Sequence, residues 1–390
     1  MPQPFNINID ETVLADLRSR LAATRWPDEI DNETWEYGTN KRYLKELCDY
    51  WQHQFDWRAR EAYLNTFRHY KETIDGVGLH FIHHKGAGKT SVPLLLVHGW
   101  PDSFVRFLKI IPLLTTADAN GFSFDVVVPS IPGYGFSDLP KEPGMNPKKI
   151  AGLLDKLMRE LGYKKYLAQG GDWGSTITEQ LALYHDSSLW GIHLTDVPHQ
   201  HSMMPVDKPS AAEEKYLEEM KIWQQTEGGY FMEQSTKPQT LAYGLTDSPA
   251  GLAGWIVEKF KVWTDNNGAI EDAVTRDELL TNLTVYWVTG TLNASTRIYY
   301  EAMKALMQSM HNPLQKINPF DKTGNKSQVP AAFAIFPKDL SHPPKEFAER
   351  FFNVQRWTKM SEGGHFAAME EPEALADDIR TFAVKLHRDK

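Results

Sequence analysis

The sequence predicts an α/β protein with a mostly parallel sheet flanked by helices, a helical extension before the sheet and a helical segment inserted into it. Short apolar runs at residues 93–97 and 124–129 show no polar alternation, as expected of strands buried on both faces of a parallel sheet. Stretches with helical periodicity separate such runs, and strands that alternate with helices form βαβ units. We therefore expect one central sheet that forms the core of the chain.

The first ninety residues are expected to be mostly helical. Asp10 can cap a helix whose leucines recur at helical spacing, and a second helical stretch with a broad aromatic face spans residues 43–70. Residues 71–84 resemble a β-hairpin whose turn contains glycine. We assign residues 1–88 to an N-terminal extension that wraps the core and the inserted helices, because its apolar face is too large to stay exposed.

Three further strands are predicted, and a long helical insertion precedes the last of them. Residues 166–171 and 190–194 are buried strands, residues 150–161 form an amphipathic helix, residues 331–336 resume the sheet and residues 372–386 form a last helix. Between them the chain is helical and rich in Trp and Tyr. We therefore divide the core into residues 89–197 and 313–390, with an inserted helical lid over residues 198–312.

Composition excludes several classes of protein. The chain has 42 Lys and Arg against 51 Asp and Glu, a net charge of −9, which argues against a nucleic-acid partner because phosphate backbones need a basic face. Cys48 is the single cysteine, so neither a disulfide framework nor a cysteine zinc cluster is expected. The amino terminus does not resemble a signal peptide, and the longest apolar run is far short of the ~20 residues that span a bilayer. We expect a soluble, cytoplasmic protein that does not bind a membrane.

Asp172 is the candidate nucleophile. The strand at residues 166–171 runs through Gly170 and Gly171 into Asp172, and a helix follows. This pattern is typical of a nucleophile elbow, a strained turn that lifts one side chain above the sheet, and the glycines let the backbone pass closely. A carboxylate in place of the usual serine attacks carbon by displacement and forms an alkyl-enzyme ester. Ser175 is expected to be a helix residue, and the alternative for Asp172 is a helix N-cap.

The loop His98-Gly99-Trp100-Pro101 follows the first apolar strand. In α/β-hydrolases this loop donates one backbone N–H to the oxyanion hole, and the residue after the nucleophile donates the other. These positions are Trp100 and Trp173. His98 is expected to be a buried structural residue.

His365 is the candidate base. It follows Gly363-Gly364 and precedes the last predicted helix, and the α/β-hydrolase order of nucleophile, acid and histidine requires a late histidine. The acid should lie in the loop after an upstream strand and orient the imidazole. Asp339 follows the strand at residues 331–336, and Asp196 is the alternative acid, after an earlier strand.

No cofactor or metal is expected. His193, His199 and His201 have the wrong spacing for two ligands on one helical face, and no cysteine lies near them. The glycine-rich residues 132–137 lack the GxxxxGK[ST] order of a phosphate-binding loop and are expected to form a tight turn from strand to helix.

With these residues placed, nearly the whole chain resembles an α/β-hydrolase-fold epoxide hydrolase of the microsomal and juvenile-hormone branch. Residues 21–27 are similar to that branch's N-terminal extension, and residues 98–101, 171–174 and 363–366 match its HGWP, GDWG and GGHF motifs in order. The membrane anchor of the animal members has no counterpart here. The resemblance implies that the protein converts an epoxide and water to a vicinal diol. The reaction would pass through an ester on Asp172 that water activated by His365 and Asp339 hydrolyses.

The resemblance also implies two lid tyrosines that hydrogen-bond the epoxide oxygen. Tyr230 follows a glycine pair as at the first site, and Tyr299 matches the second through the preceding arginine, with Tyr300 as the alternative. A phenol suits this task because it donates to a developing alkoxide while staying protonated at neutral pH.

Two other functions stay open, and so does a homodimer. A haloalkane or haloacid dehalogenase shares the Asp-His-Asp machinery but binds halide with Trp or Asn groups in place of the tyrosine pair. A non-catalytic small-molecule receptor on the same fold usually lacks part of the triad, whereas all three candidates are present here. Lid aromatics such as Trp223 and Phe231 suggest an apolar epoxide as substrate.

Overall fold

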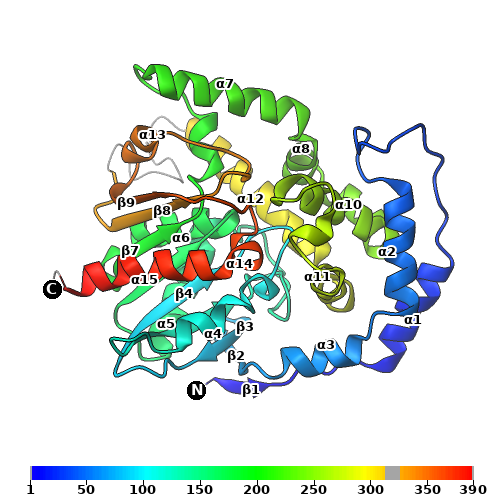
Figure 1. Cartoon of the computed structure of the whole chain (residues 1–390), viewed down its shortest axis with the longest axis horizontal. Helices are drawn as coiled ribbons and strands as arrows, with labels where there is room; N and C mark the ends of the chain where they lie inside the picture. Colours follow the sequence, from blue (N-terminus) through cyan, green and yellow to red (C-terminus); the bar gives the residue numbers. More distant parts are fainter. Residues whose placement is uncertain (1, 312–325, 389–390) are drawn as a thin grey trace.

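The computed structural model describes residues 2–311 and 326–388, and its centre is a nine-stranded sheet (Figure 1). The strand order is β1-β2-β3-β5-β4-β6-β7-β8-β9. Strands β1, β2, β3 and β5 pair antiparallel, and the strands from β5 across to β9 pair parallel. The strands are β1 (Gln3–Phe5), β2 (His69–Ile74), β3 (Val77–His84), β4 (Thr90–Val97), β5 (Phe122–Pro129), β6 (Tyr166–Gly170), β7 (Leu189–Leu194), β8 (Pro330–Ile335) and β9 (Asn353–Lys359). The parallel α/β class is therefore confirmed.

Helices cover both faces of the sheet and give it two apolar cores. Alternate residues of the central strand β4 supply them: Leu95 and Val97 pack with α5 and α6, whereas Leu94 and Leu96 pack with α4 and α15. The helices of these layers are α4 (Ile110–Thr115), α5 (Pro147–Glu160), α6 (Trp173–Tyr184), α13 (Lys345–Glu349), α14 (Ala367–Glu370) and α15 (Pro372–Arg388). Short 3₁₀ turns are η1 (Phe104–Phe107), η2 (Asp186–Ser188), η3 (His199–Met203) and η4 (Ile270–Asp272).

The lid is helical, as the sequence predicts, and it enters after β7 and returns to the sheet at β8. Its helices are α7 (Ala211–Thr226), α8 (Gly229–Thr236), α9 (Pro238–Asp247), α10 (Pro249–Trp263), α11 (Arg276–Thr289) and α12 (Leu292–His311). The predicted boundary between residues 312 and 313 lies outside the described residues. The glycine-rich residues 132–137 form tight turns, in which Tyr134 N–H donates to the Ile131 carbonyl at 2.8 Å and Ser137 N–H to the Tyr134 carbonyl at 3.1 Å. They lie in the long loop from β5 to α5, so they do not lead directly into a helix as expected.

The extension contains α1 (Glu11–Ala22), α2 (Lys41–His53) and α3 (Trp57–Leu64). The expected single helix over residues 43–70 is wrong. The Asp56 carboxylate accepts a hydrogen bond from the Ala59 amide at 3.0 Å, so it caps a new helix and ends the old one. Strand β2 has already begun by His69. The hairpin is confirmed, and Asp75 and Gly76 take positive φ in its turn.

The extension lies along the lid, with α1 and α2 beside α10 and α11 on the side away from the parallel strands (Figure 1). The Trp51 indole N–H donates to Thr284 Oγ1 at 2.9 Å, and Arg60 Nε donates to Thr281 Oγ1 at 2.9 Å. Leu47, Cys48 and Trp51 of α2 are buried, and these contacts join the extension to the lid.

Candidate active site

Asp172 occupies a strained turn between β6 and α6. Its φ of 59° and ψ of −129° lie outside the regions that a side chain normally allows. The turn is tight, because a Cβ on Gly170 would lie 2.2 Å from the Gly174 oxygen, and a Cβ on Gly174 would lie 2.0 Å from the Val97 oxygen. Asp172 is also the N-cap of α6, so the elbow and the N-cap interpretations describe the same residue. Ser175 lies inside α6, as expected.

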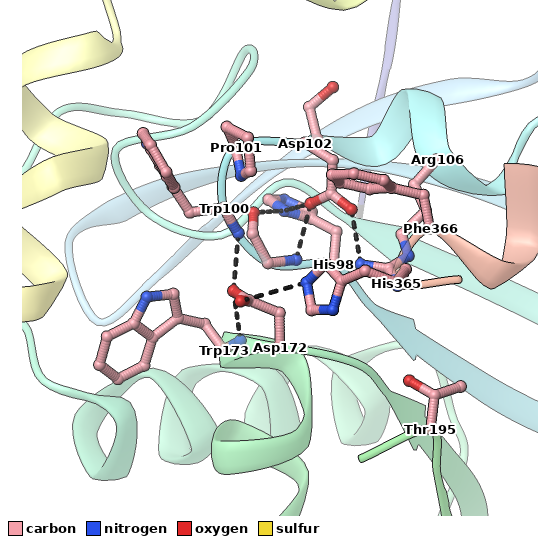
Figure 2. Close-up of polar contacts among 12 residues, drawn as sticks. His98, Trp100, Pro101, Asp102, Arg106, Asp172, Trp173, Thr195, His365 and Phe366 are labelled. Carbon is pink, nitrogen blue, oxygen red and sulfur yellow. Dashed lines mark hydrogen bonds and ion pairs between the residues drawn. The ribbon is translucent and has the colours of Figure 1, made fainter. Parts of the chain in front are cut away.

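One oxygen of Asp172 is held by two backbone amides. Trp100 N–H donates to Asp172 Oδ1 at 2.9 Å, and Trp173 N–H donates to the same atom at 2.6 Å (Figure 2). The Trp100 loop reaches this position because Gly99 has no side chain, and a Cβ there would lie 2.3 Å from Asp172 Oδ1. The two amides nominated from the sequence thus converge on one atom of the candidate nucleophile. His98 is buried, and its Nε2 accepts the Ile131 amide at 3.1 Å, which is a structural contact.

His365 lies between two carboxylates. Its Nδ1 donates to Asp339 Oδ1 at 2.7 Å, and its Nε2 lies 3.4 Å from Asp172 Oδ2. Burial alone would lower the pKa of His365, but the charges of Asp339 and Asp172 outweigh it and raise the pKa above its ordinary value. Burial likewise opposes ionisation of Asp339, yet the neighbouring His365 keeps the pKa of that carboxyl below its usual range.

Asp196 lies beneath the elbow instead of beside the imidazole. Its Oδ1 accepts hydrogen bonds from the Asp172 amide at 2.9 Å and from Ser175 Oγ at 2.6 Å. Burial raises the pKa of Asp196 to about 7. Of the two candidate acids, the structure therefore brings Asp339 to His365 and uses Asp196 to hold the turn that carries Asp172.

Tyr230 and Tyr299 face Asp172 from the lid. Tyr230 stacks on Trp100 with ring centroids 5.4 Å apart, and Tyr299 packs edge-on against Trp173 at 4.8 Å. Tyr299 is 2% exposed and lines the cavity, whereas Tyr300 is 38% exposed and does not line it. Burial raises the pKa of both cavity tyrosines well above the ordinary value, so both phenols stay protonated.

These groups share one cavity of about 70 Å³ between the sheet and the lid. Its walls away from the carboxylates are mainly apolar. They comprise Val197, Met203, Trp223, Phe231, Ala302, Met303 and Leu340, with the polar residues Thr176, His199, Gln200 and Ser341.

A buried ion pair that the sequence analysis missed joins the Trp100 loop to His365. Arg106 Nη1 donates to Asp102 Oδ2 at 2.6 Å, and Arg106 Nη2 donates to the His365 carbonyl (Figure 2). Asp102 Oδ1 in turn accepts the Gly99 amide at 2.9 Å. The signal in the sequence was an opposite-charge pair four residues apart directly after the HGWP motif.

Glu370 was also missed, and it fixes the loop that carries His365. Its buried carboxylate accepts hydrogen bonds from the backbone amides of Asp265 at 2.7 Å, Phe366 at 2.9 Å and Gly364 at 3.0 Å. Burial raises the pKa of Glu370 to about 7. Its partners are backbone groups, which leave no signal in a sequence.

The three histidines considered as metal ligands have separate surroundings. His193 Nε2 lies 3.0 Å from Asp378 Oδ2, and His201 Nε2 lies 2.7 Å from Glu179 Oε1. His199 instead lines the cavity. They do not converge on a common point.

This fold and site define an α/β-hydrolase in which aspartate replaces the serine of the elbow. Residues 92–230 match the family model for the alpha/beta hydrolase fold, and residues 2–107 match the model described as epoxide hydrolase N terminus. The chain is 37% identical to epoxide hydrolase 1 of Sus scrofa over 97% of this chain and 88% of that one. It is 36% identical to juvenile hormone epoxide hydrolase 1 of Ctenocephalides felis over 99% of this chain and 86% of that one.

Solved structures agree with these relatives. The juvenile hormone epoxide hydrolase of the silkworm Bombyx mori superposes with a TM-score of 0.84 at 30% identity, over 100% of this chain and 94% of that one. The Aspergillus niger epoxide hydrolase gives a TM-score of 0.84 at 29% identity, over 99% and 97%. The chain therefore belongs to the epoxide hydrolase family, in the branch of the microsomal and juvenile-hormone enzymes. Within the described residues no helix combines the length and apolarity needed to span a bilayer.

Proposed function

We propose that this enzyme opens an apolar epoxide with Asp172 and then releases a vicinal diol with water activated by His365. The observation that supports the proposal is that the two oxygens of Asp172 have different surroundings. Oδ1 is held by two amides, and Oδ2 is left beside His365 in a cavity that two buried phenols face.

In the first half-reaction Asp172 Oδ2 attacks one epoxide carbon while the bond from that carbon to the ring oxygen breaks. Tyr230 and Tyr299 donate hydrogen bonds to the leaving oxygen, and one of these phenols gives it the proton that makes it the first hydroxyl of the product; solvent then restores the proton of the phenol. The result is an ester between Asp172 and the substrate carbon. The walls of the cavity are mainly apolar, which favours an apolar substrate.

In the second half-reaction His365, oriented by Asp339, removes a proton from water, and the hydroxide attacks the ester carbonyl carbon. The resulting oxyanion is the former Oδ1, which the Trp100 and Trp173 amides stabilise. The intermediate collapses, the diol leaves with the proton, and Asp172 regains its carboxylate with one oxygen from water.

Formation of the ester itself prepares the base. In the resting site two carboxylates raise the pKa of His365, which favours the imidazolium. Esterification removes the charge of Asp172, so the pKa of His365 falls and the neutral imidazole becomes available to deprotonate water.

The decisive experiment traps the ester. In a His365→Gln variant the first half-reaction proceeds and the second stalls, so mass spectrometry of the intact protein after mixing with excess styrene oxide should show a gain of one whole substrate mass. The adduct should map to the peptide that contains Asp172 and be absent from the Asp172→Ala, His365→Gln double variant. A dehalogenase would instead gain the mass of a haloalkane without hydrogen halide, and a receptor would gain none. An inactive His365→Gln variant that binds epoxide without gaining mass would overturn the covalent mechanism.

The same proposal places the enzyme in the cytoplasm, without a nucleic-acid or membrane partner. A single, buried cysteine, Cys48, supports a reducing compartment, and the net charge of −9 argues against a nucleic-acid partner. Fractionation of producing cells tests it. A homodimer stays a prediction that sedimentation velocity would decide.

A further inference from the structure

The cavity contains an imidazole that the proposed reaction does not use and that forms no hydrogen bond to another described residue. Gln200 Oε1 accepts Thr176 Oγ1 at 3.3 Å, and Gln200 Nε2 donates to Glu179 Oε2 at 3.1 Å, so this amide is engaged. Ser341 is hydrogen-bonded to Tyr216. His199 also lines the cavity, where it is partly exposed, and no hydrogen bond joins its ring nitrogens to another described residue.

His199 is held in place by aromatic packing. It is the first residue of η3, five residues after the end of β7. Its ring lies edge-on to Trp223 with centroids 5.2 Å apart and tilted against Phe231 at 6.0 Å. Two lid helices, α7 and α8, supply these rings, so the imidazole is held against the lid at the cavity wall.

The imidazole is neutral at ordinary pH. Burial lowers the pKa of His199 to about 4, although the charge of Asp172 acts in the opposite direction. A neutral imidazole presents one N–H donor and one nitrogen acceptor. Because no described residue pairs with them, both are open to a ligand, and a ligand group that replaces water at either one gains a hydrogen bond inside a mainly apolar cavity.

We propose that His199 recognises a second oxygen function of the substrate. The preferred substrates are epoxides that carry an ether or hydroxyl oxygen separated from the epoxide ring by an apolar stretch. The stretch packs on Trp223 and Phe231, and the oxygen pairs with the imidazole. This inference rests on the proposed function, because the epoxide must lie at Asp172 for the remote oxygen to reach His199.

The test is a scan with straight-chain terminal epoxides. One methylene group is replaced by an ether oxygen at successive positions along the chain, and a second series places a hydroxyl at the same positions. For the native enzyme, kcat/KM should rise at one position by roughly 3- to 10-fold over the hydrocarbon parent, the scale of one neutral hydrogen bond. The rise should persist at every pH well above the pKa of His199.

Two variants remove the imidazole. His199→Phe keeps the aromatic packing, so it should hydrolyse the hydrocarbon parent but show no rise in kcat/KM at any oxygen position. His199→Leu replaces it if the Phe ring prevents folding. Met203→Leu, which changes an apolar residue of the same cavity, should retain the preference. A native enzyme with no preferred position, or a preference that survives in both His199 variants, overturns the inference. If the hydrocarbon parent is not hydrolysed by the native enzyme, the proposed function itself fails.

Discussion

At the scale of single residues, Asp172 shows how one carboxylate serves two purposes. Its Oδ1 accepts the amides of Trp100 and Trp173, and its Oδ2 lies 3.4 Å from His365 Nε2. The side chain is therefore fixed before any substrate arrives. Preorganisation of this kind is effective because no reorientation of the nucleophile is needed during the reaction.

The two lid tyrosines give the first prediction. Tyr299→Phe should slow formation of the ester by roughly 10²–10³-fold, the scale of losing one oxyanion-type donor, whereas Tyr300→Phe should leave it unchanged. Tyr230→Phe should resemble Tyr299→Phe, and the double variant should be nearly inactive. Stopped-flow tryptophan fluorescence under single-turnover conditions measures the step. The reverse order, with Tyr300→Phe impaired and Tyr299→Phe normal, would contradict the assignment.

The second prediction concerns the charge of His365. Its pKa is raised by two carboxylates, of which Asp339 contributes the larger effect, so Asp172→Asn should lower the pKa and Asp339→Asn should lower it further. NMR titration of the imidazole signals measures both. In thermodynamic terms the protonated histidine stabilises the fold fully below its unfolded pKa, and this contribution is lost as the pH rises through the folded pKa. Both variants should therefore weaken the dependence of stability on alkaline pH. An unchanged pKa in Asp172→Asn would show that the two groups do not interact.

The sequence predicted candidate reacting groups that the structure brings together, but it left two choices open, the acid and the second tyrosine. Motifs placed Asp172, His365 and the amide donors because each depends on local chain geometry. The choice of the acid depended on which loop reaches the imidazole. In the structure Asp339 contacts His365, whereas Asp196 accepts the amide of Asp172 in the elbow. The contact between Arg106 and the His365 carbonyl could not be predicted, since the two residues lie 259 positions apart along the chain.

At the scale of elements, apolar runs were sufficient for strands buried on both faces and insufficient elsewhere. Strand β9 was missed because it is a partly exposed edge strand without an apolar run, and β1 because it has only three residues. The break between α2 and α3 was missed because a continuous aromatic face concealed the capping residue Asp56. These errors arise where capping, exposure or short length outweighs hydrophobic periodicity.

The third prediction concerns the loops joined by Asp102 and Arg106. Both side chains are buried, so Asp102→Asn leaves an uncompensated guanidinium and should lower the free energy of unfolding by about 3–5 kcal/mol. It should also lower kcat, because the same contact holds the His365 loop. Lys345→Met, which breaks the exposed pair of α13 with Glu349, should cost at most about 0.5 kcal/mol. Urea unfolding compares the two. An Asp102→Asn variant as stable as the native chain would show that this pair does not fix the loops.

At the scale of the whole molecule, the extension and the lid share one buried surface, which gives the fourth prediction. Deletion of residues 1–70 uncovers the apolar side of α10 and α11 and removes β1 and the start of β2, so the product should be insoluble. Trp51→Ala should destabilise the full chain by about 3–5 kcal/mol, because a buried aromatic ring is lost. Tyr37→Ser, at an exposed position of the same extension, is the control. A soluble and fully active truncation would show that the extension is dispensable.

The brace between extension and lid also has a consequence for synthesis of the chain. Trp51 is made 233 residues before its partner Thr284, and Arg60 is made 221 residues before Thr281. Helices α1 to α3 therefore leave the ribosome long before the lid helices that bury them are synthesised. Until then their apolar side is exposed to solvent or bound by a chaperone. Contacts of such long range also slow folding, because a large loop must close before they form. The first helices to be made are thus among the last to be packed.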